Sequence, residues 1–185
     1  MPESNNQNFN HLKIHTQYSI CEGAIKIDKL KDFCKENKIP CLGISDTSNL
    51  CGALEFAENI SKVGTQPIIG TQIYFKFEDT TGLLPLIALN EKGYKRIIEL
   101  SSRSYLENDA LSDPHLDIKE ILKDTEGVLL LSGTIQGLFG KLFQKGRLEE
   151  ITKIYKSLSS KFNDNFYLEI QRHGDQNEIA FEKFN

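Results

Sequence analysis

Short apolar runs alternate with stretches of helical periodicity along almost the whole chain, and this order limits the fold more than any other property. The apolar runs that suit strands lie at 11–16, 41–45, 67–77, 83–89, 127–131 and 166–170. Apolar residues at helical spacing fall between them, at 26–38, 50–63, 94–105, 118–123, 151–162 and 177–184. Parallel neighbouring strands need crossover connections, so this order predicts one α/β domain with a largely parallel sheet.

Several elements carry finer expectations. The helix at 50–63 aligns Leu54, Ala57 and Ile60, which predicts that this face is buried. Pro85 lacks a backbone N–H, so the strand at 83–89 is expected to be interrupted or at a sheet edge. Asp117 is a candidate N-cap for the short helix that follows it. The basic residues of 141–147 are interpreted as a solvated helix face.

Composition excludes several classes of protein. A chain of 185 residues with 39% hydrophobic residues is long enough for one domain with a sizeable core. The net charge of −4 argues against a surface built mainly to hold nucleic-acid phosphates. The four cysteines form no CxxC pair, which favours free thiols over a disulfide framework or zinc site. No apolar run approaches the roughly 20 residues of a membrane span, and residues 1–10 are polar, so we expect a flexible N-terminus and a cytoplasmic protein.

Polar residues that follow the predicted strands are the candidates for chemistry, because function gathers at the carboxyl ends of parallel strands. They are His15, Asp46, Gln72, Thr134 and His173. One histidine after a strand is most often structural, but two histidines and a carboxylate raise the case for a site. The glycine-rich stretch at 133–141 (GTIQGLFGK) lacks P-loop spacing and the hydroxyl that would bind magnesium, so it does not predict nucleotide binding.

Seven strings in one order carry a family resemblance. They are HLKIHTQYSICEGA at 11–24, PCLGISDTSNLCGALEF at 40–56, QPIIGTQIY at 66–74, ALNEKGYKRIIEL at 88–100, SRSYL at 102–106, GVLLLSG at 127–133 and EIQRHG at 169–174. This set resembles the PHP (polymerase and histidinol phosphatase) domains that begin the alpha subunits of bacterial DNA polymerase III. The resemblance implies a distorted (β/α)7 barrel over 11–185. The family's final Asp-x-His motif would lie beyond Asn185, so we expect the barrel to be incomplete at its C-terminal end.

The resemblance also implies where metal ligands would lie. Active members of the family hold a trinuclear zinc or manganese cluster and hydrolyse phosphoesters. Four of its ligand positions retain a suitable residue here: His15, Glu22, Asp46 and His173. Four others are substituted: Lys13, Thr47, Gln72 and Thr134.

The substitutions remove the chemistry that such a cluster needs. Lys13 offers an ammonium without a lone pair, Gln72 lacks the negative charge of a glutamate, and threonine hydroxyls are poor ligands at neutral pH. We therefore expect no catalytic residue and no metal cofactor in this chain. If the family geometry holds, the ammonium of Lys13 lies near Glu22 and Asp46 as a fixed substitute for a cation. The alternative is that Lys13 extends into solvent.

Three functions remain open. The resemblance favours a structural module of the replicative polymerase that docks the proofreading exonuclease subunit, among other holoenzyme subunits, and leaves DNA binding to the rest of the polymerase. The magnesium-dependent nucleotidyl-transfer centre of the parent enzyme would lie in later domains. The second function is an active 3′–5′ exonuclease or phosphoesterase with bound zinc or manganese. A stand-alone phosphatase of the histidinol phosphate type agrees least with the strings at 11–24 and 66–74.

Overall fold

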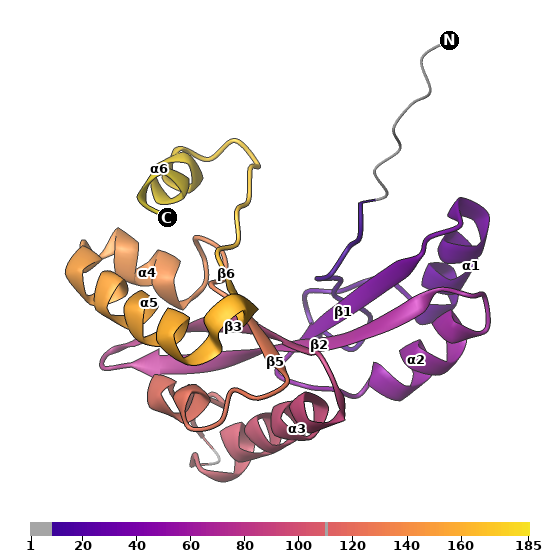
Figure 1. Ribbon diagram of the computed structural model, residues 1–185, viewed down its shortest axis with the longest axis horizontal. Coiled ribbons are helices and arrows are strands. Elements are labelled where there is room, and N and C mark those ends of the chain that lie inside the picture. Colours follow the sequence, from indigo (N-terminus) through magenta and orange to yellow (C-terminus); the bar gives the residue numbers. More distant parts are fainter. Residues whose placement is uncertain (1–8, 110) are drawn as a thin grey trace.

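The chain folds around a mixed six-stranded sheet with helices on both faces (Figure 1). The computed structural model describes residues 9–109 and 111–185, so residues 1–8 of the predicted flexible N-terminus lie outside the described residues. The strands are β1 (Cys41–Thr47), β2 (Gln66–Phe77), β3 (Thr80–Ala88), β4 (Leu116–Asp117), β5 (Val128–Leu131) and β6 (Phe166–Tyr167). The helices are α1 (Ile27–Asn37), α2 (Ala53–Ser61), α3 (Glu91–Leu106), α4 (Leu138–Gln144), α5 (Leu148–Phe162) and α6 (Gln176–Phe184), with 3-10 turns η1 (Ile118–Leu122) and η2 (Asn163–Asn165).

The α/β class is confirmed, but the expectation of a largely parallel sheet is wrong. The strand order is β1-β2-β3-β5-β6, with β4 paired to β2. β3 runs antiparallel to both of its neighbours, β2 and β5. The cause is a hairpin: only Glu78 and Asp79 separate β2 from β3, and a two-residue connection forces antiparallel pairing.

Pro85 lies in the middle of β3, which is neither interrupted nor at an edge, so that expectation is also wrong. On the β5 side, the last paired residues are Leu86 and Leu130, so Pro85 lies one residue beyond the end of that ladder. On the other side, Pro85 faces Gln72, whose carbonyl oxygen instead accepts from Ser48 N at 2.8 Å. The missing N–H of Pro85 therefore removes no ladder hydrogen bond.

The predicted first strand is reduced to two isolated bridges. Ile14 pairs with Ile44 of β1, and Thr16 pairs with Ile25. Its backbone is still held to β1, because Ile14 N donates to Gly43 O at 3.2 Å and Ser45 N donates to Ile14 O at 2.8 Å. The segment at 11–16 therefore lies beside β1, at the outer end of the strand order.

Two hydrophobic cores lie under these layers. The smaller core packs α1 and α2 against β1 and includes Phe56 and Ile60. The larger core fills the space between the sheet and helices α3, α4 and α5, which Figure 1 shows below and above the sheet. Leu54 is 71% exposed, so the predicted apolar face of α2 is wrong there. Ile60 is buried as predicted, and the other buried residues of α2 are Ala53 and Phe56.

α3 begins with two coupled backbone features. Asn90 caps the helix, since its side chain accepts from Gly93 N at 3.0 Å. A Cβ atom at Gly93 would lie 1.7 Å from the carbonyl oxygen of Gly127, so only glycine allows this approach. The Gly-Tyr pair in the string at 88–100 thus has a packing cause. The predicted cap of η1 is confirmed in the same way, with Asp117 accepting from Lys119 N at 2.8 Å.

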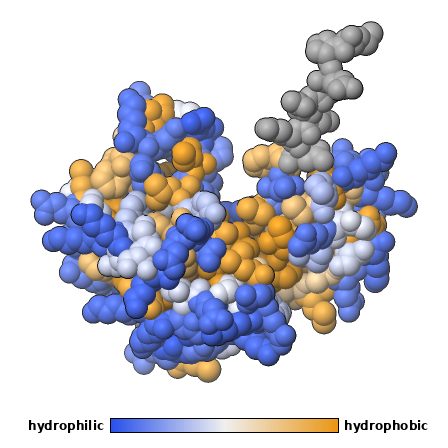
Figure 2. All heavy atoms as spheres, in the orientation of Figure 1, coloured by the Kyte–Doolittle hydropathy of each residue, from blue (hydrophilic) through white to orange (hydrophobic). Residues whose placement is uncertain are grey.

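The basic residues of 141–147 contact the β2–β3 hairpin. Lys145 is exposed, as a solvated face requires, whereas Lys141 and Arg147 are only partly exposed. Lys141 Nζ donates to Thr81 O at 2.9 Å, and Lys145 and Arg147 both pair with Asp79. Elsewhere, Figure 2 shows a hydrophilic surface over the lower part of the molecule, where α3 lies in Figure 1. Within the described residues, no helix combines the length and apolarity that crossing a bilayer requires.

Candidate functional site

Most of the predicted site residues converge on one cavity at the end of the sheet. The cavity has a volume of about 240 Å³. Its lining includes five of the predicted positions, Lys13, His15, Glu22, Gln72 and Thr134, together with Leu83, Pro85, Gly133, Gln136, Gly137 and Gln171. The sequence therefore predicted which segments meet here. Several of the polar side chains, however, bind other groups of the protein, whereas those of a metal site would face a shared cation.

Asp46 is fully engaged by the loop that follows the first segment. It is 1% exposed. Its carboxylate accepts from Thr16 N at 2.6 Å, from Thr16 Oγ1 at 2.7 Å and from Ser19 Oγ at 2.7 Å. Three donors around one buried carboxylate fix the conformation of residues 16–19 and leave it poorly available to a cation.

The same loop brings Glu22 to the cavity. Gln17 N donates to Ile25 O at 2.9 Å, which closes the loop. Inside it, a Cβ atom at Gly23 would lie 2.0 Å from the carbonyl oxygen of Thr16, so this turn requires glycine. The glycine of the Glu-Gly pair in the string at 11–24 is thus explained by the tight return of the backbone.

Two of the substituted positions form a hydrogen-bond chain with Glu22. Gln72 Nε2 donates to Thr47 Oγ1 at 2.7 Å, and the Thr47 hydroxyl in turn donates to the Glu22 carboxylate. The threonine hydroxyl is both acceptor and donor, so one side chain satisfies an amide and a carboxylate. Nearby, burial and then the charge of Glu22 raise the pKa of Tyr74 above its ordinary value.

Lys13 forms an ion pair with a residue that the sequence did not single out. Its Nζ lies 2.8 Å from Oε1 of Glu169, and the side chains are only 20% and 14% exposed. The expected neighbours of its ammonium, Glu22 and Asp46, are bound by other groups. Glu169 opens the string EIQRHG, so the signal was present but pointed to the histidine at its other end.

His173 lies away from the cavity. Its side chain is 73% exposed, and Nδ1 lies 2.9 Å from Oε1 of Glu178 in α6. Hydrogen bonds from the imidazole and the backbone N–H of His173 lower the pKa of Glu178 below its ordinary value. The contact positions the start of α6, and the described structure does not bring His173 to the other ligand positions.

The donor set does not fit a trinuclear metal cluster. In the described part of the chain, no three His, Cys, Asp or Glu side chains gather in a way that could hold a metal ion. Of the ligand positions, His15 keeps a ring nitrogen that could bind a metal, because Nδ1 is buried and has no hydrogen-bond partner within residues 9–109 and 111–185. One imidazole and one hydrogen-bonded carboxylate, beside a lysine and three glutamine amides, lack the charge and the ligand number for several divalent cations.

This α/β domain therefore gathers the predicted ligand positions at one end of its sheet, where several of them bind other groups of the protein. The family model described as "PHP domain" matches residues 11–173. The chain belongs to the PHP domain family.

Three relatives found by sequence comparison have the same name, DNA polymerase III subunit alpha. The chain is 35% identical to the DNA polymerase III subunit alpha of Caulobacter vibrioides, over 98% of the chain and 17% of that protein. It is 34% identical to the subunit of the same name from Borreliella burgdorferi, over 90% of the chain and 15% of that protein. The Vibrio cholerae subunit is 31% identical over 95% of the chain and 15% of its own length. The chain thus spans about a sixth of the length of these relatives.

A solved structure supports the fold alone. A proposed metal-dependent phosphoesterase from Bifidobacterium adolescentis has a TM-score of 0.56 with this chain at 13% identity. The match covers 95% of the chain and 82% of that structure. This likeness agrees with the α/β architecture.

Proposed function

We propose that this chain is the PHP domain of a DNA polymerase III alpha subunit and acts there as a structural module without catalysis. The observation that carries this proposal is the occupancy of the ligand positions. Asp46 is bound by Thr16 and Ser19, and Glu22 by Thr47. A hydrolytic metal centre needs carboxylates and imidazoles that face a cation, and here the Asp46 and Glu22 carboxylates face hydroxyl groups and a backbone amide.

The partner we propose is the proofreading exonuclease subunit, within a cytoplasmic replicative holoenzyme that contains the other polymerase III subunits. The sequence relatives support this context, since they are named as alpha subunits across nearly the whole chain. DNA contact and magnesium-dependent nucleotidyl transfer would belong to the rest of the polymerase, because the net charge of −4 suits protein contact better than a phosphate backbone.

Calorimetry with the exonuclease subunit tests the proposal. We expect a 1:1 complex whose affinity is unchanged by a chelator, and less than one zinc or manganese ion per chain by elemental analysis. No heat of binding, together with no complex in gel filtration, would refute the docking role.

The alternative function, a metal-dependent phosphoesterase or exonuclease, predicts a different set of results. Two or more tightly held metal ions per chain, and hydrolysis of a single-stranded oligonucleotide that a chelator abolishes, would support it. An Asp46→Asn variant then separates the chain's own activity from a contaminant, because a contaminant's activity would persist in that variant.

A further inference from the structure

The two ends of the strand order lie close together in space, although no backbone ladder joins them. At one end, the segment at 11–16 lies outside β1. At the other end, Glu169 follows β6. Among the described residues, no hydrogen bond between main-chain atoms connects the two ends. Lys13 Nζ nevertheless lies 2.8 Å from Glu169 Oε1, across 156 positions of sequence.

We propose that the Lys13–Glu169 ion pair is a metal-independent latch that joins the two ends of the sheet. A metal cluster at a strand end cross-links several strands through one set of cations. In this chain a single ammonium on the first segment supplies the positive charge, and a carboxylate beyond β6 is its acceptor. This inference rests on the metal-free role proposed above. It identifies the contact that joins the ends of the sheet in place of a metal cluster.

The backbone around each partner is anchored to the sheet by hydrogen bonds that do not involve the ion pair. Next to Lys13, Ile14 exchanges backbone hydrogen bonds with Gly43 and Ser45 of β1. Glu169 N donates to Ser132 Oγ at 2.9 Å, directly after β5. An ion pair between anchored side chains loses less conformational entropy than a pair between two mobile surface chains, so it contributes more.

Burial makes the pair hard to replace. The side chains are 20% and 14% exposed, which limits screening by water and salt. The second carboxylate oxygen, Glu169 Oε2, is buried and has no hydrogen-bond partner among the described residues. Removal of Lys13 would therefore leave this carboxylate without the one side-chain partner that it has in residues 9–109 and 111–185, which is a costly state.

A double-mutant cycle on the purified chain tests the latch. We expect Lys13→Met and Glu169→Gln each to lower the melting temperature by about 3–8 °C. The double variant should melt no more than ~2 °C below the worse single variant, since the contact is already lost. Additive losses, or single variants that melt with the wild type, would overturn the proposal. Lys13→Arg, which keeps the charge, should melt near the wild type and serves if Lys13→Met does not fold.

The exposed pair Lys92–Glu126 is the matched control, because its side chains are 52% and 68% exposed. Lys92→Met and Glu126→Gln should leave the melting temperature unchanged. Hydrogen exchange gives a second reading: loss of the latch should speed exchange in 11–16 and in 166–170 together. Exchange that rises at one end alone would contradict a connection between them. This result is independent of the docking test. The mutant cycle can show no coupling while the exonuclease subunit still binds, and it can show coupling while that subunit does not bind.

Discussion

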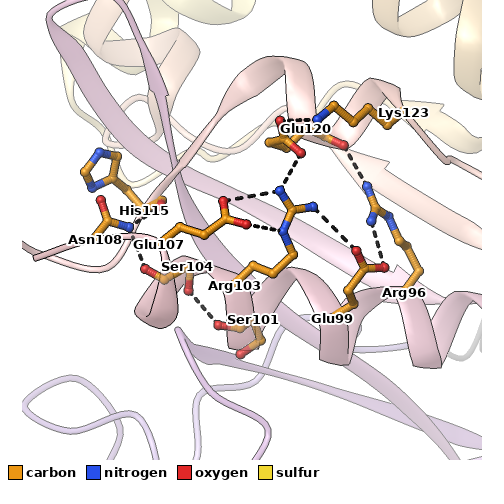
Figure 3. A network of polar contacts seen from close by, with 10 residues as sticks. All are labelled: Arg96, Glu99, Ser101, Arg103, Ser104, Glu107, Asn108, His115, Glu120 and Lys123. Carbon is orange, nitrogen blue, oxygen red and sulfur yellow. Dashed lines mark hydrogen bonds and ion pairs between the residues drawn. The ribbon is translucent and has the colours of Figure 1, made fainter.

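The network around Asp46 and the network along α3 are both dense in charged and polar side chains, but they are built differently. Asp46 binds residues 27 and 30 positions away and is 1% exposed. On α3, Arg103 pairs with Glu99 and Glu107 at helical spacing, and its side chain is 26% exposed (Figure 3). The first network holds separate segments of the chain in one geometry, whereas most contacts of the second lie along the surface of one helix. The number of ion pairs is therefore a poor guide to what each network contributes.

Arg96 shows that one helix can contain both kinds of contact. Its side chain is 7% exposed, and its guanidinium donates to the carbonyl oxygens of Glu120 at 2.7 Å and Asp124 at 3.3 Å. Figure 3 shows it reaching from α3 toward the Glu120 segment, beside the more exposed Arg103. Burial and hydrogen bonds to two backbone carbonyl oxygens set Arg96 apart from Arg103, which is 26% exposed and reaches the same segment only through the side chain of Glu120.

The largest effect is expected at Asp46. The two carboxylate oxygens of Asp46 together accept from three donors, and Asp46→Asn replaces one of them by an NH2 group that cannot accept, so we expect a loss of about 2–4 kcal/mol in the free energy of unfolding. Urea denaturation measures it. Asp32→Asn, on the exposed side of α1, is the matched control and should change the free energy by less than about 0.5 kcal/mol. An Asp46→Asn protein as stable as the wild type would show that this carboxylate does not organise the loop.

The intermediate effect is expected at Arg96. Arg96→Met keeps the buried hydrocarbon stem but leaves two backbone carbonyl oxygens without their donor, so a loss of about 1–3 kcal/mol is expected. Lys95→Met, one position earlier, removes an ion pair between side chains that are 71% and 79% exposed and should not measurably change stability. Equal losses for the two variants would remove the distinction drawn between buried and exposed pairs on α3.

The smallest effect is expected at Arg103, despite its several ion pairs, and it should depend on pH and salt. Hydrogen bonds from Lys123 and then Arg103 hold the pKa of Glu120 below its ordinary value of 4.5. A lowered carboxylate pKa gives stability that is present above pH 4.5 and is lost as the pH falls through the lowered value. The difference in stability between wild type and Arg103→Ala should therefore shrink on going from pH 6 to pH 3, and in 1 M salt. Denaturation curves that keep the same gap at both pH values would contradict this account.

Much of the fold and of the candidate site could be predicted from the chain. Periodicity located α1, α3, α5 and α6, and composition indicated one domain. The ordered strings indicated the PHP resemblance, and with it the positions of Lys13, Thr47 and Gln72 at one site. The helix positions are local properties, because each follows from residue type and spacing within a few turns. The common site of the three residues was implied by the family resemblance alone.

Tertiary structure decided the rest. A two-residue hairpin made β3 antiparallel, and its pairing limits left Pro85 harmless inside a central strand. The partner of Lys13 is Glu169, whose position depends on how far the sheet curves to bring its ends together. His173 turned toward α6 instead of the cavity. None of these outcomes can be read from local spacing, because each depends on contacts between residues that only the packing of distant segments brings within a few ångströms.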